Sequence, residues 1–161
     1  MSVKESFSHM DGDGNVRMVD ITEKKITRRS AAASCSVEMK TQTLAAIVEN
    51  RIRKGNVFTV AKVAAISAAK RTGELIPLCH ALAPEYVDVQ FAPDLKSGEL
   101  EIQTSVTVTA RTGAEMEALQ AAAQAALTIY DMCKAVDRDM RITGLQLISK
   151  EGGKSGTWKR E

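Results

Sequence analysis

The chain has 161 residues, the size of one compact domain that can bury roughly two thirds of its unfolded surface. Its 22 basic and 20 acidic residues leave a formal charge of +2, so the composition gives no reason to expect binding to nucleic acid or to an anionic membrane. The three cysteines form no Cys-x-x-Cys pair, which argues against a disulfide framework and a zinc site, and no run of about 18 apolar residues is present to span a membrane.

The N-terminal segment is polar and rich in residues that favour turns. Residues 1–16 contain the sequence DGDGN and lack the apolar core of a signal peptide. We therefore expect a flexible tail, followed by a single catalytic domain over residues 17–161 of a cytoplasmic protein.

A strand and two helices are predicted next. From Ala33 to Lys40 apolar and polar residues alternate, which predicts a half-buried strand. Thr41 is placed to cap a short helix through the sequence TLAAIVEN. Asn56 is also of a capping type, and basic residues and a glycine end the alanine-rich segment after it, so a second helix is predicted over residues 57–71.

The second half of the chain predicts a loop, a hairpin, a long helix and a last strand. In residues 73–84, GELIPLCHALAP, Pro77 and Pro84 bracket a stretch that can be neither a long helix nor a central strand, which predicts an ordered loop. Alternation in residues 85–91 and 99–110 predicts a hairpin. Residues 114–136 are rich in helix formers and predict about six turns or more of helix, and a strand is expected over residues 145–149. This order predicts an α+β fold, a ferredoxin-like antiparallel sheet with helices packed on one face.

A polar stripe runs along the long predicted helix. At about 100° per residue, one face carries Glu117, Gln120, Gln124, Asp131, Lys134 and Arg138. A solvated face accounts for the whole stripe, and Asp131 with Lys134 would then be an ordinary surface ion pair. The alternative is an acid and a base held for chemistry, because the other faces are apolar enough to be covered on more than one side.

The loop sequence IPLCH sets a thiol beside an imidazole. Neighbours in an extended chain point to opposite sides, so Cys79 and His80 are poorly placed to activate one another. His80 is the better candidate for a substrate ligand or proton carrier, and a structural histidine bonded to the backbone is the alternative.

Two basic sequences are candidates for holding an anion. Lys54-Gly55-Asn56 precedes a predicted helix, which puts an ammonium group beside free backbone N–H groups. Glycines around Lys154 would let backbone N–H groups approach a phosphate, but a flexible C-terminal turn is the preferred explanation. The tail is not a P-loop, because Ile148 stands where that motif requires a glycine.

Together these sequences resemble the MoaC family, molybdenum cofactor biosynthesis protein C. The resemblance rests on MVDIT, RKGN, AAKRTGELIPLCH, the run TGAEMEALQAAAQAALTIYDMCKAVDRDM and GGKSG, which span most of the chain from Met18 to Gly156. It implies an enzyme, a lyase that converts a cyclised guanosine triphosphate into cyclic pyranopterin monophosphate and releases diphosphate. It implies no cofactor and no set of metal ligands.

The resemblance also implies roles for individual residues. Asp131 in YDMCK is the implied catalytic acid or base, assisted by Lys134 and by Lys54 in RKGN. Lys70 in AAKR is an implied phosphate contact. The implied lining of the substrate site is Leu78, Cys79, His80, Met116 and Glu117. An aspartate beside a lysine would stay ionised and serve as a base, whereas a lysine crowded by other cations would lose its proton more easily.

The family resemblance implies a homohexamer, a trimer of dimers with the site at the dimer interface, and an upstream radical enzyme that supplies the substrate. Helix geometry agrees with a shared site. Glu117 and Asp131 are fourteen residues apart, about 21 Å along a helix, too far for one chain to close both around one reactive centre.

Two positions depart from the family pattern. Asn56 stands where aspartate is expected, and Ala81 where proline is expected. Asparagine caps a helix about as well as aspartate, so the fold should not suffer, but the family's carboxylate is absent there. The alternative function is a non-catalytic nucleotide-binding or assembly module using the same basic patches, whereas a nucleic-acid binder is disfavoured because aromatic residues are few.

Overall fold

The computed structural model describes residues 14–154 and 156–161, and these residues form both strands and helices. The elements are β1 (Thr27–Glu38), α1 (Thr41–Val48), α2 (Val57–Lys70), α3 (Thr72–Leu75), β2 (Tyr86–Asp94), β3 (Glu99–Ala110), α4 (Glu115–Cys133), β4 (Arg141–Glu151) and β5 (Trp158–Lys159). The tail expected over residues 1–16 lies almost wholly outside the described residues.

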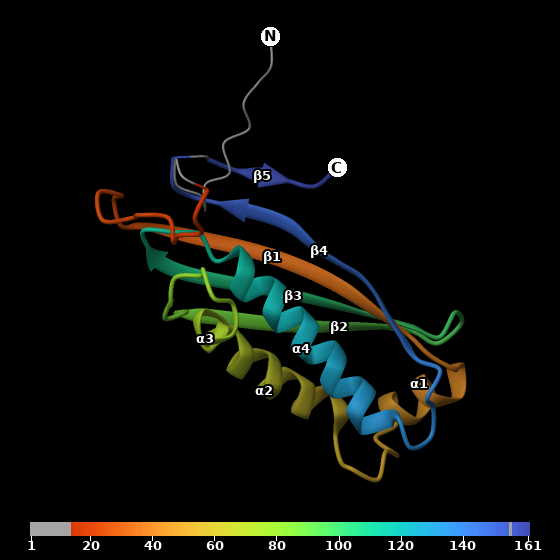
Figure 1. Ribbon diagram of the computed structural model, residues 1–161. Helices are drawn as coiled ribbons and strands as arrows, with labels where there is room; N and C mark the ends of the chain where they lie inside the picture. Colours follow the sequence, from red (N-terminus) through yellow and green to blue (C-terminus); the bar gives the residue numbers. More distant parts are fainter. Residues whose placement is uncertain (1–13, 155) are drawn as a thin grey trace.

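One antiparallel sheet carries all five strands, in the order β2-β3-β1-β4-β5. Figure 1 shows α2 and α4 side by side on one face of this sheet, with α1 at one end of it. The connections β1 to β2 and β3 to β4 contain the helices, as in a ferredoxin-like arrangement. The predicted fold class is therefore confirmed, and the short β5 is an addition that the glycine-rich tail did not predict.

Small side chains fill the layer between the helices and the sheet. On α4, Ala118, Ala122 and Ala125 are fully buried, and on α2 Ala61 and Ala65 are too. Alanines allow two helices and a sheet to approach closely, so this sequence packs its long helix against neighbours on two sides. Burial thus explains why the faces of this helix outside the polar stripe are apolar, as the pattern indicated.

The buried face of β3 carries one polar side chain, and its hydroxyl group is hydrogen bonded. Leu100, Ile102 and Val106 point into the core, and Thr104 between them donates its hydroxyl hydrogen to the Ala118 carbonyl oxygen on α4 at 2.8 Å. A buried hydroxyl costs little free energy when it is hydrogen bonded in this way. The contact fixes the height of α4 above the sheet.

Of the two capping residues predicted from the sequence, one is confirmed and one is wrong. Asn56 caps α2, since its side-chain oxygen accepts a hydrogen bond from Thr59 N at 2.8 Å. The prediction that Thr41 caps the first helix was wrong, because α1 begins at Thr41 itself and Lys40 is the residue before it. Lys40 offers no capping side-chain bond, and a distant carboxylate, Asp137, binds there instead.

Several predicted boundaries also change. The helix predicted to run to residue 136 ends at Cys133, which leaves 19 residues or about five turns, because Val136 N and Asp137 N both donate to the Cys133 carbonyl and turn the chain. A short helix, α3, lies inside the expected loop. The strands β1 and β4 begin earlier than predicted, since their first residues are small or polar and show no alternation of hydrophobicity.

Candidate active site

The predicted pair of Asp131 and Lys134 is part of a cluster of three charged groups at the C-terminus of α4. The Lys134 Nζ lies 2.7 Å from Asp131 Oδ1, within the last turn. The Lys54 Nζ, which comes from the loop between α1 and α2, lies 3.0 Å from Asp131 Oδ2 and donates to the Asp131 carbonyl oxygen at 2.8 Å. The fold therefore adds a second ammonium group, from a residue 77 positions away in the chain, to the pair visible in the sequence.

Electrostatics fix the charge state of this cluster. Hydrogen bonds from Lys134 and then Lys54, together with their charges, lower the pKa of Asp131 to about 2. The hydrogen bond and charge of Asp131 raise the pKa of Lys134. Lys134 is not a lysine crowded by cations, because its nearest charge is the Asp131 carboxylate, so the condition under which a lysine would lose its proton more easily is not met here. At neutral pH the cluster presents proton donors around an ionised carboxylate.

A pocket of about 500 Å³ lies at the other end of α4. The loop after α3 contributes Leu78, Cys79 and His80, and the start of α4 contributes Met116. Four of the predicted substrate-site residues thus lie together. Burial, followed by the charges of Glu117 and Glu115, raises the pKa of the Cys79 thiol, so this group is a poor nucleophile near neutral pH.

Glu117, the fifth predicted lining residue, is buried in the first turn of α4. It is 1% exposed, and neither of its carboxylate oxygens has a hydrogen-bond partner among the described residues. Burial, assisted by the charge of Glu115, raises the pKa of Glu117 to about 7. The interpretation of the whole polar stripe as a solvated face is therefore wrong at this position.

A second pocket, of about 750 Å³, adjoins the first and is strongly basic. The two pockets share Lys24, Thr112, Gly113 and Glu115. We call it the basic pocket, and its cationic lining residues are Lys24, Lys25, Arg29, Arg111, Lys150 and Lys154. Only Glu23 and Glu115 oppose these charges, and Glu115 is paired with Lys150 at 3.0 Å.

Sequence reasoning found Lys154 in this pocket and missed the rest. The signal was present in the paired basic residues at the start of β1 and in Lys150 at the end of β4, which the strand register sets opposite Ala31. The glycine-rich tail also has a physical reason, because Gly152 has a φ of +96° and a Cβ there would overlap the backbone carbonyl oxygen of Arg28. Without the sheet order, no sequence pattern brings these segments together.

The predicted site residues therefore form two groups at opposite ends of α4. Lys54, Asp131 and Lys134 lie at the C-terminal end, and the IPLCH loop with Met116 lies at the N-terminal end. Lys70, at the end of α2, is exposed and lines neither the IPLCH pocket nor the basic pocket in one chain. A single chain does not bring the two groups together.

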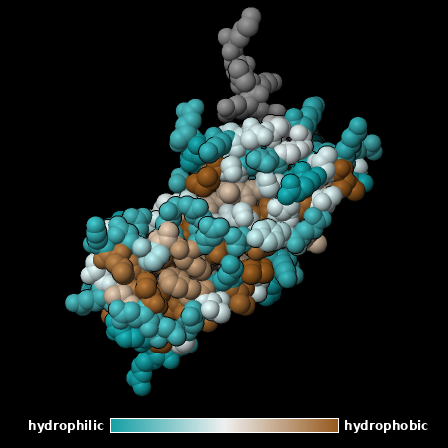
Figure 2. All heavy atoms as spheres, turned by 180° about the vertical axis from the view of Figure 1, so that it is seen from behind, coloured by the Kyte–Doolittle hydropathy of each residue, from teal (hydrophilic) through white to brown (hydrophobic). Residues whose placement is uncertain are grey.

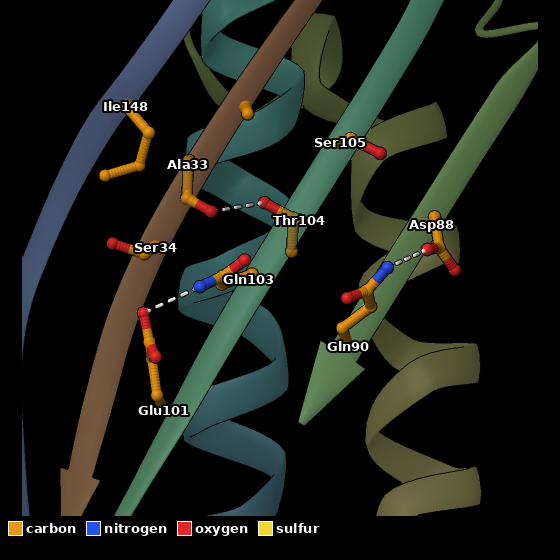
Figure 3. Close-up of a pocket in the computed structure, with 10 residues that line it drawn as sticks. Ala33, Ser34, Asp88, Gln90, Glu101, Gln103, Thr104, Ser105 and Ile148 are labelled. Atoms are coloured by element: carbon orange, nitrogen blue, oxygen red, sulfur yellow. Dashed lines mark hydrogen bonds between the residues drawn. The ribbon is translucent and has the colours of Figure 1, made fainter. Parts of the chain in front are cut away.

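A different hollow, drawn in Figure 3, lies on the face of the sheet opposite the helices. Its volume is only about 180 Å³, and its charged side chains, Asp88 and Glu101, are acidic. These carboxylates would repel a phosphorylated substrate. None of the predicted site residues lines it, so we exclude it as the active site.

Two further searches of the described residues give no additional site. No group of three or more His, Cys, Asp or Glu side chains is arranged to hold a metal ion within residues 14–154 and 156–161. In the same ranges, every helix is too short or too polar to cross a bilayer.

Comparison with known proteins gives a consistent family. Residues 18–153 match the MoaC family. The cyclic pyranopterin monophosphate synthase of Chloroflexus aurantiacus (strain J-10-fl) is 53% identical over 154 residues, which cover 96% of this chain and 94% of that protein. The enzymes of the same name from Oleidesulfovibrio alaskensis and a Thermoanaerobacter species (strain X514) are 51% and 47% identical, over 98% and 97% of this chain and 99% of each relative. The chain belongs to the MoaC family.

Proposed function

We propose that this chain is a cyclic pyranopterin monophosphate synthase, a lyase of molybdenum cofactor biosynthesis. Its substrate is a cyclised guanosine triphosphate supplied by an upstream radical enzyme, and its products are cyclic pyranopterin monophosphate and diphosphate. The observation that carries this proposal is the basic pocket beside the IPLCH loop, in a chain that matches the family over residues 18–153.

The basic pocket suits the triphosphate. Six cationic side chains surround a volume of about 750 Å³, and Lys24 lies at its junction with the IPLCH pocket. A triphosphate and a departing diphosphate carry several negative charges, which fixed cations stabilise most strongly where water is partly excluded. The IPLCH pocket, with Leu78, Cys79, His80 and Met116, then receives the purine-derived rings.

The Lys54–Asp131–Lys134 cluster suits the proton transfers. Opening and rebuilding a ring requires donors and acceptors held within hydrogen-bond reach of the reacting atoms. Lys134 is protonated at neutral pH, as lysine ordinarily is, and Asp131 raises its pKa further, so its part is to offer positive charge and hydrogen bonds to the reacting groups. Asp131 holds both ammonium groups within 3.0 Å of its own oxygens and so orients them together.

The two groups meet when a second chain supplies the missing end. We assign the site to the dimer interface of a cytoplasmic homohexamer, a trimer of dimers, in which Glu117 and Lys70 of one chain join the substrate site. Within residues 14–154 and 156–161 the Glu117 carboxylate meets no hydrogen-bond donor, which supports this, because a buried acid without hydrogen bonds is unusual in a complete site.

Exposed apolar side chains also support an assembly. Val63 on α2 and Leu127 on α4 are 59% and 53% exposed in one chain. The view in Figure 2 shows hydrophobic side chains gathered in the lower left part of a mostly hydrophilic surface. Apolar surface of this kind is typical of contacts between subunits.

Turnover of the cyclised nucleotide tests the proposal. The chain is mixed with substrate freshly made by the radical enzyme, and diphosphate and cyclic pyranopterin monophosphate are measured together. We expect both products in equal amounts. Substrate binding without diphosphate release would contradict the proposal and favour the non-catalytic nucleotide-binding module.

A matched control comes from the sheet. Asp88 pairs with Lys62 at 3.1 Å, and its hydrogen bonds with Gln90 and then Lys62 lower its pKa, so it resembles Asp131 electrostatically but lies in the excluded hollow. Asp88→Asn should therefore turn over like the wild type, whereas Asp131→Asn should not.

A further inference from the structure

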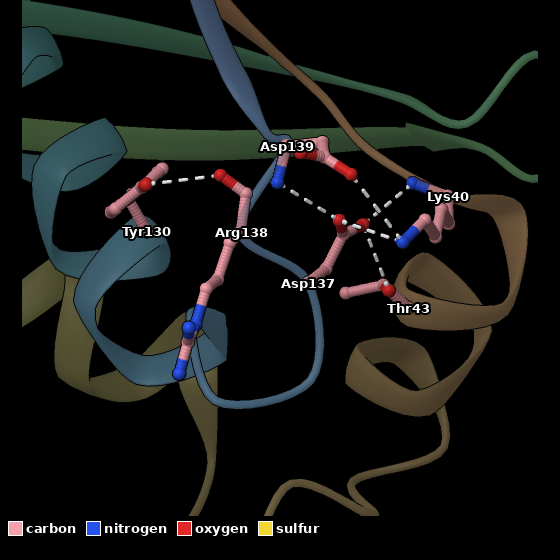
Figure 4. A network of polar contacts seen from close by, with 6 residues as sticks. All are labelled: Lys40, Thr43, Tyr130, Asp137, Arg138 and Asp139. Atoms are coloured by element: carbon pink, nitrogen blue, oxygen red, sulfur yellow. Dashed lines mark hydrogen bonds and ion pairs between the residues drawn. The ribbon is translucent and has the colours of Figure 1, made fainter.

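Asp137 is a buried carboxylate for which the proposed chemistry has no use. Its side chain is 1% exposed, and it lies in the turn after α4. Figure 4 shows its two oxygens among donors from three directions. Oδ2 accepts from Lys40 N at 2.9 Å and from the Thr43 hydroxyl at 3.1 Å, and Oδ1 accepts from Asp139 N at 3.3 Å.

These hydrogen bonds decide the charge of the group. Burial alone would raise the pKa of Asp137, but the bonds from Lys40 N, Thr43 and Asp139 N, with the Lys40 charge, outweigh burial and lower it. The Lys40 ammonium lies 3.6 Å from Oδ1 and also 3.7 Å from the exposed Asp139. Asp137 is thus an ionised anchor whose oxygens are occupied by protein groups.

The anchor joins two elements that are far apart in the sequence. Lys40 and Thr43 form the start of α1, which has no capping side chain of its own. Asp137 belongs to the turn that closes α4, and this turn is held from its other side by the Tyr130 hydroxyl, which donates to the Arg138 carbonyl oxygen at 3.1 Å. Asp137 therefore fixes the start of α1 against the end of α4.

The segment after α1 carries Lys54. A gap of about 320 Å³ separates it from α4, and both sides line this gap, with Arg53 and Lys54 on one side and Met132 and Val136 on the other. Lys54 reaches across to Asp131 at 3.0 Å. This distance depends on how α1 and α4 are spaced, whereas the contact of Lys134 with Asp131 lies within one helix turn and does not.

We infer that Asp137 is a positioning residue for the proposed active site, because it sets the spacing across which Lys54 reaches Asp131. Its loss separates Lys54 from Asp131 while leaving the Lys134 contact in place. The inference rests on the proposed function only where activity is the readout, since the position of Lys54 is measurable in the resting protein.

The test compares Asp137→Asn with Asp139→Asn. Both remove one carboxylate from the same turn and from the same lysine, but the Asp139 side chain is 88% exposed and touches no element of the cluster. The pKa of Asp131, about 2 in the wild type, is followed by carbon-detected NMR. We expect it to rise in Asp137→Asn towards, but not up to, 3.8, because Lys134 remains, and to stay unchanged in Asp139→Asn.

Kinetics give the second readout. Misplacing Lys54 should lower kcat on the order of 10-fold or more in Asp137→Asn. KM should change by less than about 3-fold, because the six cations of the basic pocket, which hold the phosphates, make no contact with Asp137. If Asp137→Asn fails to fold, Thr43→Val removes one of the donors at similar volume and should show the same changes in smaller measure.

The outcomes are distinct. A lower melting temperature with an unchanged Asp131 pKa and unchanged kcat overturns the inference and leaves Asp137 a structural residue. A wild type without turnover overturns the proposed function, while the Asp131 titration still decides whether Asp137 positions Lys54.

Discussion

The two ends of α4 each carry a carboxylate, and their surroundings shift the pKa values of these two groups in opposite directions. At the C-terminal end, Asp131 is exposed, has two ammonium partners, and has its pKa lowered to about 2. At the N-terminal end, Glu117 is buried, has no hydrogen-bond partner among the described residues, and has its pKa raised to about 7. One helix thus carries a carboxylate that is complete within a single chain and another that is not.

The difference indicates where a partner is missing. Buried carboxylates in folded proteins are almost always paired, so an unpaired one marks a place that substrate or another subunit completes. We therefore infer that the charged groups at the C-terminal end of α4 have their partners within one chain. The N-terminal end, with Glu117, is then a part of the site that substrate or another subunit completes. The following predictions break or sharpen this contrast.

Asp131→Asn should have the largest effect. An amide of similar size cannot hold two ammonium groups together by charge, so we expect kcat to fall on the order of 1000-fold. The far-ultraviolet circular dichroism should remain that of the wild type, because the residue is exposed. Turnover at a near wild-type rate would make the cluster a surface ion network.

Lys54→Ala should come next. It removes one of the two ammonium groups and leaves Lys134 in contact with Asp131, so kcat should fall on the order of 100-fold. The melting temperature should drop by no more than a few degrees, because an exposed ion pair contributes little to stability. Normal kinetics with a large loss of stability would show that Lys54 is structural.

Glu117→Gln tests the N-terminal end of α4 through the pH dependence of stability. The folded pKa of about 7 lies above the ordinary 4.5, so the folded chain binds more protons between these values. The contribution of Glu117 to the free energy of unfolding is therefore most favourable below about pH 4.5, and it is lost as the pH rises through about 7.

Urea unfolding at fixed protein concentration measures this effect. Glu117→Gln should be more stable than the wild type by roughly 3 kcal/mol at pH 8, and the gap should close as the pH falls below about 4.5. A gap that does not change with pH would mean that a cation from another subunit already pairs with Glu117.

Lys154→Ala should have the smallest effect. It is one of six cations in the basic pocket, so KM should rise only about 3-fold at low salt and less at high salt, with kcat retained. Lys62→Ala, on α2, removes a cation that pairs with Asp88 at 3.1 Å and lines neither the basic pocket nor the IPLCH pocket, so it provides the control and should leave KM unchanged. A fall in kcat would contradict a role in binding alone and would show that Lys154 acts in catalysis.

The sequence predicted the fold well because its signals are local. The cap at Asn56, the alternation in β3 and the alanine-rich α4 each depend on neighbours within a few residues. The start of β1 and the short β5 escaped, since serine, arginine and a single exposed tryptophan gain a strand only from the partners that pair with them.

The site was harder because its contacts are not local. Asp131 and Lys134 are visible as a pair in one helix turn, but no pattern reveals that Lys54 completes it, and the motif resemblance alone suggested so. Periodicity placed Glu117 on a solvated face, because it cannot tell which side of a helix the rest of the fold buries. The basic pocket depends on strand order, which a single sequence leaves open.

Mixing two inactive variants tests most directly whether the two ends of α4 form one site across two chains. Asp131→Asn loses the C-terminal half and Glu117→Ala the N-terminal half, and the two proteins are combined under conditions that exchange subunits. Random pairing makes half the dimers mixed, each with one intact site, so activity should recover to about a quarter of the wild-type value. No recovery, with exchange proven by mass spectrometry of labelled chains, would contradict the shared site.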